Sequence, residues 1–332
     1  MLKGVYILGQ PISLTDEQIL ESYRRMLFIR RLEERIGQLY SMGLVRGFCH
    51  LYIGQEAVAA GMHNVLLPTD AVITSYREHG FALMSGVSAE VIIAELMGKS
   101  TGCSKGKGGS MHMFNVAHNF YGGHGIVGAQ VSLGTGLAFA RKYEEDGGVV
   151  FTCLGDGAIN QGQVYESFNM AALWKLPVVY IVENNEYAMG TSVERASFVK
   201  ELYKRGEGNG VPGRQVNGMD LFEVTKEVAA AARYCREGQG PILLEMKTYR
   251  YRGHSMSDPA KYRTREEVDN VRNNNDPLLH VREYVLKHKI AKEEVLDNLE
   301  KEIRNLLKDA VASAEASAEP AASELYTDVY RN

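Results

Sequence analysis

The sequence has few cysteines, and none of them lies in a metal-binding or disulfide pattern. The four residues, Cys49, Cys103, Cys153 and Cys235, are far apart and form no CxxC pair. We therefore expect reduced, packed thiols, and neither a zinc site nor a disulfide framework. A catalytic pair of Cys49 with His50 is disfavoured, because adjacent residues in an extended segment point to opposite sides.

The sequence also lacks long apolar runs and a strong excess of one charge. No run approaches the ~20 apolar residues that span a bilayer, and the first residues show neither a signal peptide nor an Arg- and Ser-rich transit segment. Lysine and arginine total 37 against 41 acidic residues, and the basic residues are dispersed. We expect no membrane and no nucleic-acid partner, and a bacterial cytoplasmic location rather than a mitochondrial matrix.

The composition is that of an ordinary globular protein, with 45% hydrophobic and 23% charged residues in 332. A capping box at Thr15 to Gln18 begins a long amphipathic helix that extends to about Tyr40. From about 46 to 249, short β-like runs alternate with helical ones, which predicts one doubly wound α/β domain with a parallel sheet. Strands are expected near 71–74, 149–154, 177–182 and 241–249, and helices near 55–66, 89–97, 130–143, 160–174 and 221–236.

The predicted organisation has three parts. Residues 1–45 form an N-terminal helical extension, and residues 46–266 form the α/β domain, which includes a polar loop over 250–266. Residues 267–332 contain C-terminal helices, expected from about 277 to 310, and a tail. Pro320 is expected to end any helical extension beyond residue 310.

The most informative segment begins with Gly155-Asp156-Gly157 and ends with Asn184-Asn185. In a right-handed parallel crossover both strands end at the same sheet edge, so Asp156 and Asn185 should converge. Their carboxylate and amide oxygens are hard ligands that suit Mg²⁺ together with phosphate oxygens. Gly157 permits close approach of a diphosphate at a helix N-terminus. On spacing alone, the alternative is a tight strand-to-helix turn followed by an ordinary polar turn.

Two glycine-rich stretches have more than one interpretation. Residues 102–109 contain Lys105 and Lys107, but the spacing is one residue short of a Walker loop and the Ser or Thr after the lysine is missing. A Rossmann fingerprint fails as well, because Asn160 stands where the third glycine should be. Nucleotide binding is therefore a minor alternative. Residues 120–130 could bring backbone against a cofactor or could pack helices closely.

The histidines differ in their surroundings. His50 and His254 lie in polar, glycine-flanked segments. For His79 and His112, a structural histidine with satisfied hydrogen bonds is the more common outcome.

Five segments carry a family resemblance. They are Arg46-Gly47-Phe48-Cys49-His50-Leu51, Gly106 to Met113, Gly155 to Asn185, Thr191 to Arg195, and Tyr249 to Pro259. In this order they resemble the alpha subunits of the thiamine-diphosphate-dependent pyruvate dehydrogenase component, over about residues 20–330. The resemblance implies an α/β thiamine diphosphate-binding fold and an α₂β₂ heterotetramer with a beta subunit, with the cofactor at each alpha-beta interface.

The resemblance also implies roles for individual residues. Mg²⁺ would be held by Asp156, Asn185 and the backbone carbonyl of Tyr187. The diphosphate end of the cofactor would be held by Tyr76, Arg77, Gly157 and Ala158. The aminopyrimidine would be lined by Gly125 and Val127. The active-site histidines that handle protons would be His50 and His254.

The implied reaction is the oxidative decarboxylation of pyruvate, followed by acetyl transfer to a lipoyl group of a lipoylated dihydrolipoyl transacetylase. The glutamate that contacts the pyrimidine belongs to the beta subunit in this family, and Glu56 is better explained as a helix-start residue. Ser255 and Ser192 match positions phosphorylated in animal relatives, but the segment 258–262 is shorter and lacks their next serine. Ala188 stands where relatives have glycine.

Two other functions compete with this one. The first is the alpha subunit of a related branched-chain 2-oxoacid or acetoin dehydrogenase, which shares the Asp156 and Asn185 unit. The second is a noncatalytic scaffold, which would require lesions at the metal ligands or at His254. The sequence contains no such lesions.

Overall fold

A parallel six-stranded sheet forms the centre of the chain in the computed structural model, which describes residues 13–330. The strand order is β2-β1-β3-β4-β8-β7, and every neighbouring pair is parallel. The strands are β1 (Ala71–Ser75), β2 (Phe120–His124), β3 (Val150–Gly155), β4 (Val178–Asn184), β7 (Gly213–Asn217) and β8 (Ile242–Lys247). The predicted doubly wound α/β architecture is confirmed.

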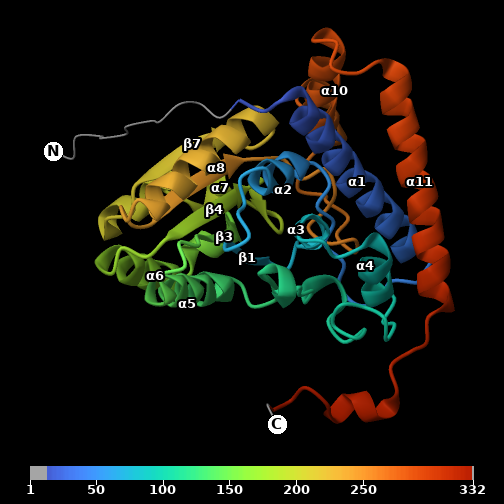
Figure 1. Ribbon diagram of the computed structural model, residues 1–332, viewed down its shortest axis with the longest axis horizontal. Coiled ribbons are helices and arrows are strands. Elements are labelled where there is room, and N and C mark those ends of the chain that lie inside the picture. Colours follow the sequence, from blue (N-terminus) through green and yellow to red (C-terminus); the bar gives the residue numbers. More distant parts are fainter. Residues whose placement is uncertain (1–12, 331–332) are drawn as a thin grey trace.

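Helices cover both faces of this sheet (Figure 1). One face packs against α5 (Ala129–Glu144) and α6 (Gly162–Leu173), and the other against α2 (Glu56–His63) and α8 (Leu221–Arg236). Successive strand residues point to opposite faces. Val150 accordingly belongs to the core beneath α5 and α6, whereas Phe151 belongs to the larger core on the other side. Because both faces are buried, ligands can reach the strands only at their ends.

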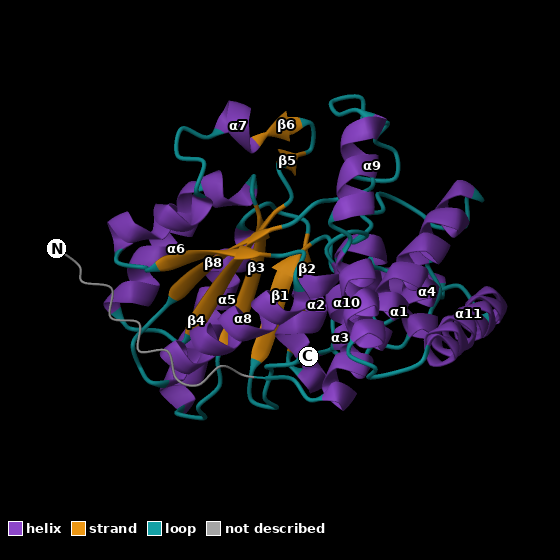
Figure 2. Cartoon of the chain, turned by 90° about the horizontal axis from the view of Figure 1, so that it is seen from above, coloured by secondary structure: helices purple, strands orange, loops and turns teal. Residues whose placement is uncertain are grey.

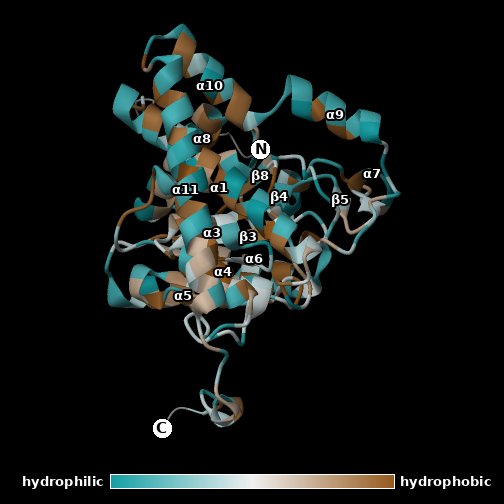
Figure 3. Cartoon of the chain, turned by 90° about the vertical axis from the view of Figure 1, so that its right-hand side faces the viewer, coloured by the Kyte–Doolittle hydropathy of each residue, from teal (hydrophilic) through white to brown (hydrophobic). Residues whose placement is uncertain are grey.

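A group of outer helices packs beside the sheet. It consists of α1 (Asp16–Ser41), α3 (His79–Met84), α4 (Ala89–Leu96), α10 (Pro277–Lys287) and α11 (Glu293–Ala316). Figure 1 shows α1 and α11 side by side, and Figure 3 shows hydrophobic and hydrophilic residues alternating along α10 and α11. The predicted capping box is confirmed, because the Thr15 hydroxyl accepts from the Gln18 N–H and the Gln18 side chain accepts from the Thr15 N–H. No helix within residues 13–330 is long and apolar enough to cross a membrane.

The remaining elements are short, apart from α9 (Arg265–Asn274). They are the β5 (Tyr187–Ala188) and β6 (Thr191–Ser192) hairpin, α7 (Val193–Ala196), and the 3₁₀ turns η1 (Gly109–Met111), η2 (Val116–His118), η3 (Ala158–Asn160), η4 (Leu202–Asn209) and η5 (Ala322–Tyr326). Figure 2 shows β5, β6 and α7 beyond the ends of the central strands. The first half of the glycine-rich stretch 120–130 forms the edge strand β2, and two helices, α10 and α11, occupy the C-terminal region where helices were expected.

The glycine-rich stretch 102–109 wraps around a carboxylate of the protein itself. Glu95 is fully buried, and its two oxygens accept from the N–H groups of Ser104 at 2.8 Å, Gly106 at 2.9 Å, Gly108 at 2.7 Å and Gly109 at 3.0 Å. Such a concave row of N–H groups is the geometry that binds an anion. Here the anion is Glu95, so these donors are already engaged.

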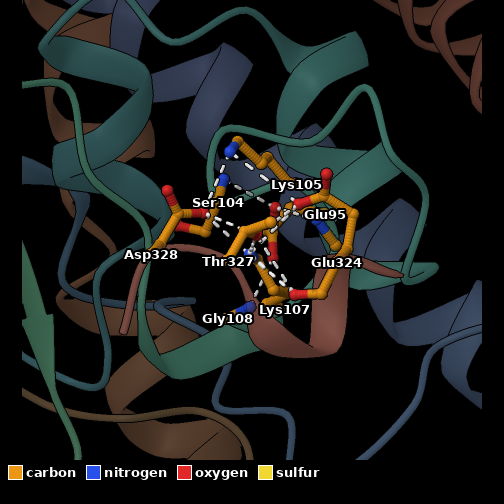
Figure 4. A network of polar contacts seen from close by, with 9 residues as sticks. Glu95, Ser104, Lys105, Lys107, Gly108, Glu324, Thr327 and Asp328 are labelled. Atoms are coloured by element: carbon orange, nitrogen blue, oxygen red, sulfur yellow. Dashed lines mark hydrogen bonds and ion pairs between the residues drawn. The ribbon is translucent and has the colours of Figure 1, made fainter. Parts of the chain in front are cut away.

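The lysines of this loop point to the C-terminal tail (Figure 4). Lys107 Nζ lies 2.8 Å from Asp328 Oδ2 and 3.3 Å from Glu324 Oε2, and Lys105 Nζ lies 2.9 Å from Asp328 Oδ2. These side chains are substantially exposed, so solvent screens the ion pairs and they contribute little to stability. The tail is thus held by weak surface contacts rather than by a core.

One buried ion-pair cluster connects three helices. Arg30 of α1 contacts Glu56 of α2 at 2.5 Å and Asp276, the residue before α10, at 3.1 Å. All three side chains are almost fully buried, and their mutual contacts satisfy the guanidinium on two sides. The Glu56 carboxylate also accepts from the Gly54 N–H, which agrees with its predicted place at the start of a helix.

We predict that Arg30→Ala destabilises the protein by about 3–5 kcal/mol, because it leaves two buried carboxylates without a cation. The control is Arg24→Ala, which removes an exposed pair with Glu302 and should cost about 1 kcal/mol at most. Denaturant unfolding of both variants measures the difference. Equal losses would show that the cluster does not connect the helices.

Candidate active site

A cavity of about 790 Å³ lies at the carboxyl ends of the strands. Residues that follow five of the six strands line it. These are Tyr76 and Arg77 after β1, Gly125 and Val127 after β2, Asp156, Gly157 and Ala158 after β3, Asn185 and Tyr187 after β4, and His254 after β8. His50 lines it from the segment before α2. The structure therefore brings together all the site residues that the sequence indicated, while their individual roles stay predictions.

The oxygen atoms that would hold a cation converge in this cavity. Gly155 of β3 is in register with Glu183 of β4, so Asp156 and Asn185 leave the sheet side by side. Arg250 Nη1 donates to Asn185 Oδ1 at 3.1 Å and to the Tyr187 carbonyl at 3.0 Å. One cationic nitrogen thus reaches two of the three predicted metal ligands.

This donor set fits a hard cation such as Mg²⁺, which binds carboxylate, amide, carbonyl and phosphate oxygens. Within residues 13–330 no cluster of three or more His, Cys, Asp or Glu side chains could hold a metal. A cation at Asp156 therefore depends on neutral oxygens and on oxygens brought by its ligand. Burial raises the pKa of Asp156 to about 6, while the N–H of Asn185 and the Arg250 charge oppose this shift.

Two buried guanidinium groups give the cavity a positive character. Arg77 donates to the backbone carbonyls of Leu51 and His254, both at 2.7 Å. Arg250 is 1% exposed and also bonds only to neutral oxygens. In the described part of the chain neither arginine forms an ion pair with a carboxylate. Burial and the neighbouring Arg250 lower the pKa of Arg77 to about 10, because both disfavour its charged form.

Gly157 packs closely against Ala188 of β5. A Cβ added at this position would lie 2.6 Å from the Ala188 Cβ, closer than real Cβ atoms approach. The Ala188 side chain cannot rotate away, so the β5 backbone beside Tyr187 would have to move. The absence of a side chain at residue 157 therefore keeps the predicted metal and diphosphate positions adjacent.

His50, His254 and Tyr76 form a ring cluster on one wall. The centroid of the His50 ring lies 4.5 Å from that of Tyr76 and 5.2 Å from that of His254. The Tyr76 hydroxyl is 3.4 Å from His254 Nε2. Burial, and then the Arg77 charge, lower the pKa of His50 to about 2 and that of His254 to about 4. Both imidazoles are therefore neutral near pH 7. Their Nδ1 atoms are buried without a hydrogen-bond partner among the described residues.

The loop that carries His254 is fixed by an aspartate. Asp258 Oδ2 accepts from the His254 N–H at 2.6 Å and from the Tyr262 hydroxyl at 2.8 Å. The same hydroxyl accepts from Arg250 Nη2 at 2.9 Å, and Arg250 in turn contacts Asn185 and Tyr187, which connects the loop to two of the predicted metal ligands. Arg250 and Asp258 both lie within the Tyr249 to Pro259 motif, but sequence reasoning assigned them no role. The signal available was an arginine and an aspartate that flank a glycine-histidine pair.

Cys49 is excluded as a nucleophile. Its side chain is fully buried, and burial together with the nearby Glu33 carboxylate raises the pKa of the thiol to about 12. The His50 ring lines the cavity, whereas the Cys49 side chain belongs to the core. This agrees with the prediction that the two adjacent residues point to opposite sides.

The fold and the site define an α/β protein with one cavity at the carboxyl edge of a parallel sheet, lined by oxygen-bearing side chains and by two buried arginines. The sequence model of the dehydrogenase E1 component family matches residues 24–323, and the chain belongs to this family.

Curated relatives span nearly the whole chain. It is 56% identical over 316 residues to the pyruvate dehydrogenase E1 component subunit alpha of Rickettsia felis, covering 95% of this chain and 97% of the relative. The corresponding subunit of Rhizobium meliloti is 57% identical over 321 residues, covering 97% and 92%. The somatic mitochondrial form of Sus scrofa is 51% identical over 327 residues, covering 98% and 83%.

We predict that Gly157→Ala destabilises the protein by about 1–3 kcal/mol, as overpacking of a tight site does. In an Ala188→Gly background the same change should cost much less, because the opposing Cβ is gone. Gly162→Ala serves as the control, since nothing lies within 4 Å of its added Cβ. Thermal unfolding of the four variants provides the comparison. If Gly157→Ala costs as much with glycine at 188 as with alanine, the contact is not the cause.

Proposed function

We propose that this chain is the alpha subunit of a pyruvate dehydrogenase (acetyl-transferring) in the cytoplasm of a bacterium. With a beta subunit in an α₂β₂ heterotetramer, it would bind thiamine diphosphate and Mg²⁺, decarboxylate pyruvate, and pass the acetyl group to a lipoylated dihydrolipoyl transacetylase. The observation that carries the proposal is the convergence of cation-binding oxygens and two uncompensated guanidinium groups in one cavity. The names of the relatives add support.

Each end of the cofactor has matching groups in the cavity. Asp156, Asn185 and the Tyr187 carbonyl would hold Mg²⁺, which would supply positive charge beside the diphosphate. The diphosphate would be held by Arg77, the Tyr76 hydroxyl and the N–H groups of Gly157 and Ala158, which begin η3. Gly125 and Val127 would contact the aminopyrimidine. When bound, thiamine diphosphate supplies the electron sink that makes the loss of carbon dioxide possible.

The two histidines are suited to accept protons. Because His50 and His254 are neutral near pH 7, each has a free lone pair that can accept a hydrogen bond or a proton from a reacting group. Both Nδ1 atoms are buried and lack a partner among the described residues, so no hydrogen bond at Nδ1 fixes which ring nitrogen carries the proton. General acid-base catalysis of this kind contributes about 10²- to 10⁴-fold.

The need for a partner chain is supported by the carboxylates of the cavity wall, none of which is left to hydrogen-bond the pyrimidine. Each lining carboxylate within residues 13–330 is already engaged, because Asp156 is a metal-ligand candidate, Glu183 accepts from the Tyr52 hydroxyl, and Asp258 holds the His254 loop. None is free to hydrogen-bond the pyrimidine. A carboxylate for this purpose would therefore come from the beta subunit.

The outer face of α5 and α6 offers a surface for that partner. Large apolar side chains are exposed along it, among them Leu133, Phe139, Tyr143, Met170 and Trp174. Tyr143 is 81% exposed, and Phe139 stacks on Tyr143 and makes a tilted ring contact with Trp174. An apolar surface of this kind is typical of an interaction site. It lies on the same side of the sheet as Val127, which is itself 42% exposed.

We predict that Asp156→Ala abolishes Mg²⁺-dependent binding of thiamine diphosphate and leaves the sheet folded, because Asp156 follows β3 rather than lying inside it. Calorimetric titration of the cofactor into the reconstituted tetramer measures this, with circular dichroism as the test of folding. The control is Asp297→Ala, which changes an exposed aspartate of α11 and should bind normally. Wild-type affinity in Asp156→Ala would contradict the metal assignment.

We also predict that the purified chain alone does not decarboxylate pyruvate, and that activity appears on addition of the beta subunit. The physical reason is the missing free carboxylate in the cavity wall. Product release is measured from labelled pyruvate at equal chain concentrations, with and without the partner. Robust turnover by the single chain would show that it activates the cofactor unaided.

A further inference from the structure

A buried polar chain lies outside the cavity and ends at the backbone of His50. Glu33 of α1 contacts His79 Nδ1 of α3, with both carboxylate oxygens at 3.1 Å. His79 Nε2 lies 2.9 Å from the Ser110 hydroxyl in η1, and this hydroxyl accepts from the His50 N–H at 3.1 Å. Glu33 and His79 are fully buried, and Ser110 is 2% exposed.

In this row of hydrogen-bonded groups, the direction of the last hydrogen bond, between Ser110 and the His50 backbone, is fixed. The Ser110 oxygen must accept from the His50 N–H, because a backbone nitrogen can only donate. With neutral His79, Nδ1–H donates to Glu33, Nε2 accepts the Ser110 proton, and every group is satisfied. With protonated His79, Nε2–H donates to the hydroxyl, which still accepts from His50. In both states Ser110 holds the His50 backbone.

The order serine, histidine, carboxylate matches that of a hydrolase triad. Here it cannot attack a substrate, since Ser110, His79 and Glu33 are buried and none of them lines the cavity. A buried polar chain that is fully hydrogen-bonded instead makes its surroundings rigid. In this protein the part made rigid is the backbone of His50, because its N–H donates to Ser110.

The His50 ring depends on this anchor because its own Nδ1 has no partner among the described residues. Among the described residues, the His50 ring packs against the rings of Tyr76 and His254, and its position otherwise follows from its backbone. On either side, the Cys49 carbonyl accepts from the Met256 N–H at 2.8 Å, and the Leu51 carbonyl accepts from Arg77. The Ser110 contact is the third tie, and it lies at His50 itself.

We propose that Glu33, His79 and Ser110 form a positioning relay that fixes His50 for the reaction, an inference that rests on the proposed function. The three are positioning residues rather than catalytic ones, because they act through His50. Misplacing a reacting group by 1 Å can cost about 100-fold in rate. Loss of the relay should therefore reduce kcat while leaving cofactor affinity and pyruvate KM nearly unchanged.

The test is a double-mutant cycle in the reconstituted tetramer, with pyruvate as substrate and a dye as electron acceptor. Ser110→Ala should lower kcat about 10- to 100-fold, with pyruvate KM within about twofold. In a His50→Ala background the same change should have almost no further effect, because the relay then has nothing to position. Equal losses in the two backgrounds would overturn the relay and indicate a general structural role.

Control variants separate positioning from folding. The first control is Ser22→Ala in α1, which removes a fully buried hydroxyl that donates to the Gln18 carbonyl at 2.7 Å. Ser22 does not line the cavity, so this change should leave kcat unchanged. If Ser110→Ala does not fold, Glu33 replaces it in the cycle. Glu33→Gln keeps an oxygen that accepts from His79 and should retain activity, whereas Glu33→Leu should lose it only when His50 is present. Equal activity of the Gln and Leu variants would overturn the relay.

A crystal structure of Ser110→Ala keeps this inference independent of the proposed function. The His50 ring should shift relative to Tyr76 and His254, and an unchanged ring overturns the relay whatever the substrate. A wild-type tetramer without pyruvate activity contradicts only the proposed function. The two failures are therefore distinguishable.

Discussion

The parallel, in-register pairing of β3 with β4 is the constraint on which the site depends. Gly155 lies opposite Glu183, so Asp156, one residue further, and Asn185, two residues beyond Glu183, emerge at the same edge and line the same cavity. A shift of one residue would turn Asp156 or Asn185 toward the opposite face of the sheet. Because helices cover both faces, that edge is also where the strands are open to ligand. Position and access are therefore set by the same pairing.

The buried arginines differ in whether a carboxylate of the protein neutralises their charge, and this difference distinguishes a structural arginine from those in the cavity. Arg30 is matched by Glu56 and Asp276, so its charge is neutralised within the fold. Arg77 and Arg250 are equally buried but bond to carbonyl, amide and hydroxyl oxygens, which do not neutralise them. Burying an unmatched cation is costly unless another charge compensates it. The cost is accounted for if a bound anion supplies the missing negative charge.

Much of this edge could be predicted from the sequence, because strand patterns and the Gly-Asp-Gly turn are local signals. These signals indicated Asp156, Gly157 and Asn185, whereas the roles of the other eight site residues came from the family resemblance, and all eleven line one cavity. The sequence did not indicate β2, since Phe120–His124 contains two glycines and no β-branched residue and forms a strand only through pairing with β1. Arg250 was missed because its partners, Asn185 and Tyr187, are more than sixty residues away. Contacts of that kind exist only in the folded chain.

The glycine-rich stretch 102–109 shows how a local pattern can indicate the right geometry and the wrong ligand. Its N–H groups do surround an anion, but the anion is Glu95, and its lysines turn outward to the tail. Gly109, one of the donors to Glu95, is also the first residue of η1, which contains Ser110. The carboxylate therefore holds η1 from one side while His79 holds it from the other. A loop with the composition of a nucleotide site thus acts here behind the cavity wall, where it fixes the serine that anchors His50.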